Sequence, residues 1–177
     1  GNHGIRFVFP NAPAIPVTIN QGYVMPAWYD ILEMSLERKI DTAQIEQSAS
    51  SIRALIAQEN ERGVPSEHIV IAGFSQGGAV AYQTALSYDK PLAGLLTLST
   101  YLATKDSLVL SDANKNLKIA IHHGTQDPVV PVQLGQEAKA WLESKGYQPQ
   151  FYSYPMAHQV CMPQLKIIGK WLNDVLA

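Results

Sequence analysis

A serine at position 75 has the surroundings of a catalytic nucleophile. The segment 73–77 reads Gly-Phe-Ser-Gln-Gly, with an apolar run at 69–72 before it and small residues at 78–81 after it. This order predicts a buried strand, a tight turn at Ser75 and a helix. The glycines leave room for backbone to pass close to a strained turn, and the N–H groups at the helix start would face an oxyanion. Alone, the G-x-S-x-G pattern is weak evidence, because small polar loops often contain it.

An acid and a base follow Ser75 in the chain order that α/β-hydrolases use. Asp127 lies in the loop after the apolar run 117–121, and His158 comes just after the strand-like run 150–154. The carboxyl ends of parallel strands meet at one edge of a sheet, so the three side chains can converge although they are far apart in sequence. The order therefore predicts a nucleophile–acid–base triad.

Each of the last two residues also has a simpler explanation. Asp127 precedes a proline, and Asp-Pro commonly forms a turn, while His158 could be an ordinary loop histidine. Their occurrence together with Ser75, in the right order, favours catalysis. His122 and His123 come before the acid, at the end of the strand that leads to it, so we expect them to be structural.

Several stretches resemble the carboxylesterase and acyl-protein thioesterase group of α/β-hydrolases, the phospholipase/carboxylesterase family. They are F-P-N-A-P at 9–13, P-V-T-I-N at 16–20, M-P-A-W-Y-D at 25–30, A-G-F-S-Q-G-G-A at 72–79, L-S-T-Y at 98–101, H-G-T-Q-D at 123–127 and P-M-A-H at 155–158. The resemblance spans nearly the whole chain. It departs at Ala157, where the family usually has glycine.

The resemblance implies a role for each candidate residue. Ser75 would be the nucleophile, Asp127 the acid and His158 the base, and the backbone N–H of Gln76 would be one oxyanion donor. The expected reaction is hydrolysis of a carboxylic ester or thioester through an acyl-enzyme, with no metal and no organic cofactor. The expected partner is a small-molecule or lipidated ester or thioester.

The start of the chain departs more strongly from the family pattern. In the family, a strand that ends in an H-G-x-G-like loop comes before the first matching stretch and supplies a second oxyanion N–H. Here a strand-like run, 5–9, follows almost at once, which leaves no room for the intervening helix. We therefore expect residues 1–177 to be one α/β-hydrolase domain that lacks its N-terminal strands. An inactive truncated form and a non-catalytic binding module of the same fold are the alternatives.

The composition excludes several other function classes. The formal net charge is −2 and no basic run occurs, which argues against nucleic acid and against electrostatic binding to membranes. No apolar stretch is long enough to span a bilayer, and no cluster of metal-ligating residues is visible. The single cysteine, Cys161, suits a reducing compartment, so we expect a cytoplasmic location. The oligomeric state stays open.

The remaining pattern alternates strands and helices. Strands are expected at 5–9, 69–73, 93–98, 118–122 and 149–154, and helices at 42–62, 76–87, 131–145 and 162–176. This alternation predicts a mostly parallel sheet with helices on both faces. In the last helix the predicted buried stripe is Leu165, Ile168, Leu172 and Val175.

The segment 10–40 is expected to be long and irregular. It is too long for a plain connector and too apolar for disorder. It could form a lid or wall over an acyl-binding groove, or a small satellite core under a loop. Trp28 in this segment and Leu102, just past the strand at 93–98, are the candidate substrate-binding residues, although Trp28 could be purely structural.

Overall fold

The computed structural model describes residues 14–16, 21, 24–27, 31–33 and 39–177. The strands are β1 Ala14–Pro16, β2 Val24–Pro26, β3 Ile31–Glu33, β4 Lys39–Ile40, β5 Val70–Phe74, β6 Gly94–Leu98, β7 Ile119–Gly124 and β8 Gln150–Tyr154. The helices are α1 Thr42–Glu61, α2 Gln76–Ser87, α3 Val132–Ser144 and α4 Met162–Leu176, with short 3-10 turns η2 Ser66–His68 and η3 Asp112–Asn114. None of these helices is both long and apolar enough to cross a bilayer.

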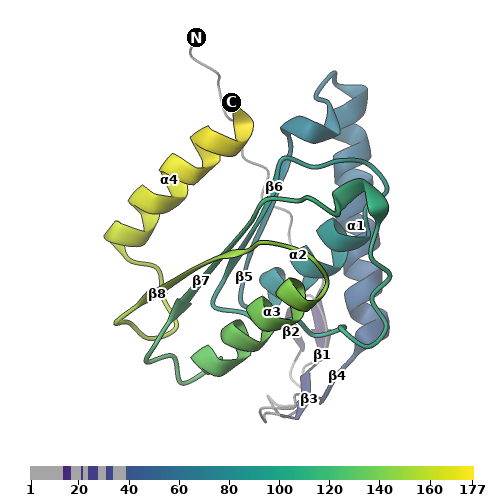
Figure 1. The fold of residues 1–177 in the computed structure, drawn as a ribbon. Helices are drawn as coiled ribbons and strands as arrows, with labels where there is room; N and C mark the ends of the chain where they lie inside the picture. The colour runs from purple at the N-terminus through teal and green to yellow at the C-terminus, as the bar shows by residue number, and fades with distance from the viewer. Residues whose placement is uncertain (1–13, 17–20, 22–23, 28–30, 34–38) are drawn as a thin grey trace.

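The main sheet has four parallel strands in the order β5-β6-β7-β8 (Figure 1). The pairing of β5 with β6 runs as far as Phe74 opposite Leu98, and that of β7 with β8 runs as far as Gly124 opposite Tyr154. The carboxyl ends of all four strands therefore lie at one edge, as expected for a functional edge in an α/β sheet. The predicted mostly parallel sheet is confirmed.

Helices cover both faces of this sheet, with α4 on one side and α1, α2 and α3 on the other (Figure 1). Alternate residues of β6 show the division. Leu96 packs in a cluster with Ile168 and Trp171 of α4. Its neighbour Thr97 faces α2, where its hydroxyl donates to the Tyr82 hydroxyl oxygen at 2.9 Å. A buried parallel sheet of this kind holds its strand ends rigidly, which suits a site built from several strands.

The predicted bounds of the four helices are correct to within one residue, and local interactions set the ends of α1 and α3. The Asp41 carboxylate accepts the backbone N–H of Gln44 at 3.0 Å and caps α1. Gly63 and Gly146, which follow α1 and α3, have φ values of 95° and 93°. A left-handed residue after the last turn of a helix is favourable for glycine and unfavourable for residues with a Cβ.

The predicted buried stripe of α4 is wrong at Leu165. That side chain is 48% exposed, and the fully buried position in the first turn is Gln164. Ile168 is buried as predicted, and Trp171 is buried as well. Gln164 is drawn inward because its Oε1 accepts the backbone N–H of Cys161 and caps the helix, which a scan for apolar spacing does not detect.

The expectation that residues 10–40 are irregular is also wrong for the described part of this segment. β1 pairs with β2 in antiparallel register, with Ile15 opposite Met25, and β3 pairs with β4. Prolines end both β1 and β2, and proline weakens the sequence signal of a strand. The strand expected at 5–9 and Trp28 lie outside the described residues.

Candidate active site

Ser75 occupies a strained turn between β5 and α2. Its backbone angles are φ 55° and ψ −122°, a combination that residues other than glycine rarely adopt. The Ser75 N–H donates to the Leu98 carbonyl on the neighbouring strand at 2.9 Å. A Cβ on Gly73 would collide with the backbone carbonyl of Gly77, so the first glycine of the motif lets β5 and α2 approach this closely.

The structure brings the three predicted side chains into one hydrogen-bonded row. His158 Nε2 lies 3.1 Å from Ser75 Oγ, and His158 Nδ1 lies 2.6 Å from Asp127 Oδ2. An ionised carboxylate can only accept, so Nδ1 donates to Asp127 and Nε2 is left to accept the serine proton. The arrangement can therefore activate a hydroxyl as a nucleophile.

Asp127 is held from its other side by its own loop. Its Oδ1 accepts the backbone N–H groups of Val129 and Val130, each at 2.8 Å. The carboxylate is buried, and these bonds fix its orientation so that Oδ2 faces His158. Asp127 therefore does both things that the sequence allowed. It forms an Asp-Pro turn through Oδ1, and it binds His158 through Oδ2.

The loops of the acid and the base are joined through their backbones. The Thr125 N–H donates to the Tyr154 carbonyl at 2.8 Å, and the Gln126 N–H donates to the Met156 carbonyl at 3.1 Å. A Cβ on Gly124 would collide with the Met156 carbonyl oxygen. The glycine therefore allows the loop that carries His158 to lie directly against the end of β7.

Phe74 supports the imidazole of His158 from one face. The two ring centroids are 4.7 Å apart, with the rings tilted by 45°, and Phe74 remains 39% exposed. Val129 and Val160, which follow Asp127 and His158 in sequence by two residues each, are exposed apolar side chains as well. Sequence reasoning missed all three residues, and only for Val129 and Val160 was the spacing from the predicted triad a usable signal.

His123 has a structural role, as its position before the acid predicts. Its Nε2 lies 2.7 Å from the Val130 carbonyl, to which it must donate, and 3.8 Å from Asp127 Oδ2. Burial lowers the pKa of His123, so the ring is neutral. Its Nδ1 is fully buried with no hydrogen-bond partner in the structure, and it therefore cannot serve as a base for a substrate.

His122 lies on the α4 face of β7 and is also fully buried. Its Nδ1 is 2.9 Å from the Tyr154 hydroxyl, and its ring stacks on Tyr152 with centroids 4.7 Å apart. Burial lowers the pKa of His122 to about 4. In the unfolded chain a histidine has a pKa near 6.5, so between about pH 6.5 and pH 4 the unfolded chain binds a proton at His122 and the folded chain does not.

This difference predicts acid sensitivity. The contribution of His122 to the free energy of unfolding should fall as pH drops below about 6.5 and should level off below about 4, because only the unfolded state gains the proton in between. Between pH 7 and pH 4.5 the wild-type chain should lose free energy of unfolding. We expect His122→Phe, which keeps a ring against Tyr152, to reduce this loss by about 2–3 kcal/mol. Urea unfolding at both pH values measures it. His68→Gln, at an exposed histidine, is the control and should keep the full loss.

The other two predicted site residues within the described part have different surroundings. Gln76 is the first residue of α2, so its N–H belongs to the same peptide group as the Ser75 carbonyl. Leu102 is 9% exposed and packs in the main core cluster. Its contact with an acyl chain stays a prediction. Among the described residues, no three His, Cys, Asp or Glu side chains gather as metal ligands.

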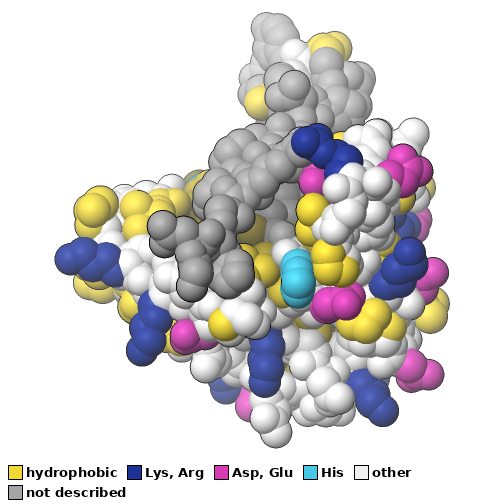
Figure 2. All heavy atoms as spheres, turned by 90° about the horizontal axis from the view of Figure 1, so that it is seen from above, with side chains coloured by type: hydrophobic (Ala, Val, Ile, Leu, Met, Phe, Trp, Pro, Cys, Tyr) yellow, Lys and Arg dark blue, Asp and Glu magenta, His cyan; other side chains and the backbone are white. Residues whose placement is uncertain are grey.

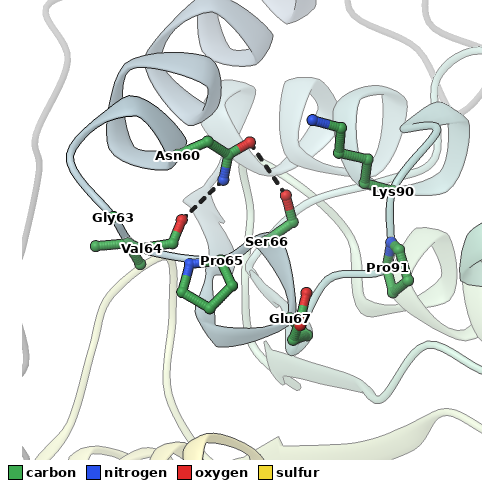
Figure 3. A pocket seen from close by; sticks show the side chains of 8 residues that line it. All are labelled: Asn60, Gly63, Val64, Pro65, Ser66, Glu67, Lys90 and Pro91. Carbon is green, nitrogen blue, oxygen red and sulfur yellow. Dashed lines mark hydrogen bonds between the residues drawn. The ribbon is translucent and has the colours of Figure 1, made fainter.

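A pocket of about 410 Å³ lies at the opposite end of β5 from Ser75 (Figure 3). It is formed by the segment 63–67 together with Asn60, Lys90 and Pro91. The Asn60 amide NH₂ donates to the Val64 carbonyl, and the Asn60 amide oxygen accepts the Ser66 hydroxyl, so the side chains of Asn60 and Ser66 already have partners. Because it lies at the amino end of the strand, this pocket is separate from the Ser75–His158 row.

A sequence profile of the phospholipase/carboxylesterase family matches residues 2–176. The chain therefore belongs to the phospholipase/carboxylesterase family. Its α/β-hydrolase fold agrees with this, and family membership makes it a carboxylic ester hydrolase. On the face drawn in Figure 2, the described Lys, Arg, Asp and Glu side chains are scattered among apolar and uncharged ones.

Two acyl-protein thioesterases and one solved structure are similar to this chain over nearly its whole length. Acyl-protein thioesterase 1 of Neurospora crassa is 37% identical over 97% of this chain and 74% of its own length. The enzyme of the same name from Mycosarcoma maydis is 37% identical over 97% of this chain and 78% of its own length. The crystal structure of Arabidopsis thaliana SOBER1 superposes with a TM-score of 0.90, at 33% identity, over 96% of this chain and 83% of that chain.

Proposed function

We propose that the chain hydrolyses carboxylic esters or thioesters through an acyl-enzyme on Ser75. The observation that carries the proposal is the hydrogen-bonded row from Asp127 through His158 to Ser75 at the carboxyl edge of the sheet. The residue types, their order in the chain and their distances all fit this chemistry. Similarity to acyl-protein thioesterases supports a thioester as well as an ester.

In the proposed mechanism, Ser75 Oγ attacks the acyl carbon while its proton moves to His158 Nε2. Asp127 keeps the Nδ1–H tautomer in place and stabilises the imidazolium that forms. The oxyanion accepts the N–H of Gln76 at the start of α2. His158 then protonates the leaving alcohol or thiol. In the second half of the reaction, water attacks the acyl carbon while His158 takes its proton, and His158 returns this proton to Ser75 Oγ as the carboxylic acid leaves.

We further propose an apolar acyl group of modest size. Phe74, Val129 and Val160 provide exposed apolar surface in sequence positions next to Ser75, Asp127 and His158. Trp28 and Leu102 are proposed to add to the acyl wall. A charged acyl group would find no counter-charge among these side chains, and it would lose hydration without compensation. The lone Cys161 favours a reducing, cytoplasmic setting for the reaction.

A fluorophosphonate probe tests the catalytic assignment directly. We expect one covalent label per chain, located on Ser75 by peptide mass spectrometry. Pretreatment with the probe should abolish hydrolysis of p-nitrophenyl butyrate. An unlabelled, inactive chain would instead fit a binding module of the same fold.

An acyl-chain series tests the substrate class. We expect kcat/KM for p-nitrophenyl esters to rise from acetate upward, since each buried CH₂ contributes about 0.8 kcal/mol, and to level off when the surface is filled. A peptide thioester that carries the best-accepted acyl chain should be cleaved, and the matching amide and a phosphate monoester should not. A flat series, or a preference for succinyl over butyryl esters, would contradict the apolar assignment.

A further inference from the structure

Thr100 reaches over from the neighbouring strand to the backbone of the proposed nucleophile. It lies two residues past the end of β6 and is 2% exposed. Its hydroxyl donates to the Ser75 carbonyl oxygen at 2.5 Å. The first turn of α2 already has its backbone hydrogen bonds to the Ser75 carbonyl, so the Thr100 hydroxyl is not needed to form the helix.

The first turn of α2 is shaped to admit this side chain. The Ser75 carbonyl already accepts the N–H groups of Gly78 and Ala79, at 2.9 and 3.3 Å. A Cβ on Gly78 would run into the Thr100 side chain. The second glycine after Gln76 therefore leaves room for Thr100 to reach the carbonyl, which gives a physical reason for the sixth residue of the G-F-S-Q-G-G segment.

The Ser75 carbonyl and the Gln76 N–H belong to one planar peptide group. A hydrogen bond that fixes the direction of the carbonyl also fixes the direction of the N–H, and it polarises the N–H into a stronger donor. We propose that Thr100 is a positioning residue that orients the Gln76 N–H for the oxyanion. The inference rests on the proposed acyl-transfer function, and it assigns to Thr100 no contact with the substrate.

The same short segment also holds the other side of Ser75. The Leu98 carbonyl accepts the Ser75 N–H, and Thr100 donates to the Ser75 carbonyl. Both polar backbone groups of Ser75 are therefore hydrogen-bonded to the segment 98–100. Between them, Ser99 has φ 52° and donates its N–H to the His122 carbonyl at 2.8 Å. This left-handed residue turns the chain after β6 so that Leu98 and Thr100 both face Ser75.

Isosteric replacement separates orientation of the oxyanion donor from simple packing. Thr100→Val keeps the shape that packs on Gly78 and removes the hydroxyl, while Thr100→Ser keeps the hydroxyl. We expect Thr100→Val to lower kcat for p-nitrophenyl butyrate about tenfold with KM within about twofold, because only the transition state carries the oxyanion. The Ki of an alkyl trifluoromethyl ketone, whose serine adduct carries the same oxyanion, should rise by a similar factor.

Three further variants complete the experiment. Thr100→Ser should stay within about twofold of the wild type, and Thr100→Cys, a weak donor of similar size, should fall between Ser and Val even if Thr100→Val is poorly folded. Thr104→Val is the matched control, because that buried hydroxyl donates to the Gln83 side chain and not to the turn.

The results distinguish three conclusions. Equal kcat in wild type and Thr100→Val would overturn the inference, and so would a Thr100→Ser loss as large as that of Thr100→Val. A thermal melting point that falls without the selective loss in kcat and Ki would show a structural tie only and would also overturn it. A wild-type chain that neither hydrolyses the ester nor takes the fluorophosphonate label would overturn the proposed function itself.

Discussion

Replacing Ser75 with alanine should abolish ester hydrolysis while the chain stays folded. The expected loss in kcat is about 10⁴-fold or more, because a nucleophile acts as a unit with its base and the remaining groups supply little. The fold should survive because, among the described residues, the hydrogen bond of Ser75 Oγ is with His158 and not with the backbone of the turn. Steady-state kinetics and a thermal melt of the purified variant measure the two effects.

Ser99→Ala is the matched control for this experiment. Ser99 also follows a strand of the same sheet and also has a positive φ. Its hydroxyl is fully buried with no hydrogen-bond partner in the structure, so it cannot reach a substrate. We expect Ser99→Ala to keep wild-type rates. More than a few per cent of wild-type activity in Ser75→Ala would show that the nucleophile has been assigned wrongly.

Asp127→Asn should lower kcat strongly, by about 10⁴-fold, without loss of the loop. The amide oxygen can still accept the N–H groups of Val129 and Val130, which hold the loop in place. The amide NH₂ group would then face His158 Nδ1 and favour the tautomer whose Nε2 carries a proton. That tautomer cannot accept the proton of Ser75.

Asp106→Asn and Asp112→Asn provide the comparison, since neither carboxylate lies in the loop that directly follows β7. Both variants should retain wild-type kcat/KM. Near-normal activity in Asp127→Asn, together with a loss in one of the other two, would reassign the acid. Measuring kcat from pH 6 to pH 9 for each variant checks that a shifted optimum is not mistaken for a lost residue.

The sequence predicted the fold well where a single rule governs the structure. The parallel sheet follows from alternating apolar runs and helical stripes, and the four helices lie within one residue of their predicted bounds. It failed where a polar side chain replaces an apolar one, as at Gln164, whose capping bond carries it into the interior. It also failed at β1 and β2, where prolines obscure the strand pattern.

The site divides in the same way. The sequence predicted Ser75, Asp127 and His158 because their order along the chain, and their positions just after apolar runs, can be read without a structure. Phe74 under the imidazole and Thr100 behind the nucleophile could not, because each acts through a neighbour on a different strand or loop. Only the register of β5 against β6 places Thr100 beside Ser75, and that register is set by pairing across the sheet.

The backbone joint between the loops of the acid and the base has a consequence for how this scaffold can change. Thr125 and Gln126 hold the segment of His158 through their backbone N–H groups, which every residue except proline possesses. Mutations at these two positions to any residue other than proline therefore leave these hydrogen bonds intact, whereas a Cβ at Gly124 would collide with the Met156 carbonyl. Random libraries aimed at new substrates can vary the side chains of Val129 and Val160. They must retain glycine at 124 and leave out proline at 129, because the Val129 N–H holds the Asp127 carboxylate.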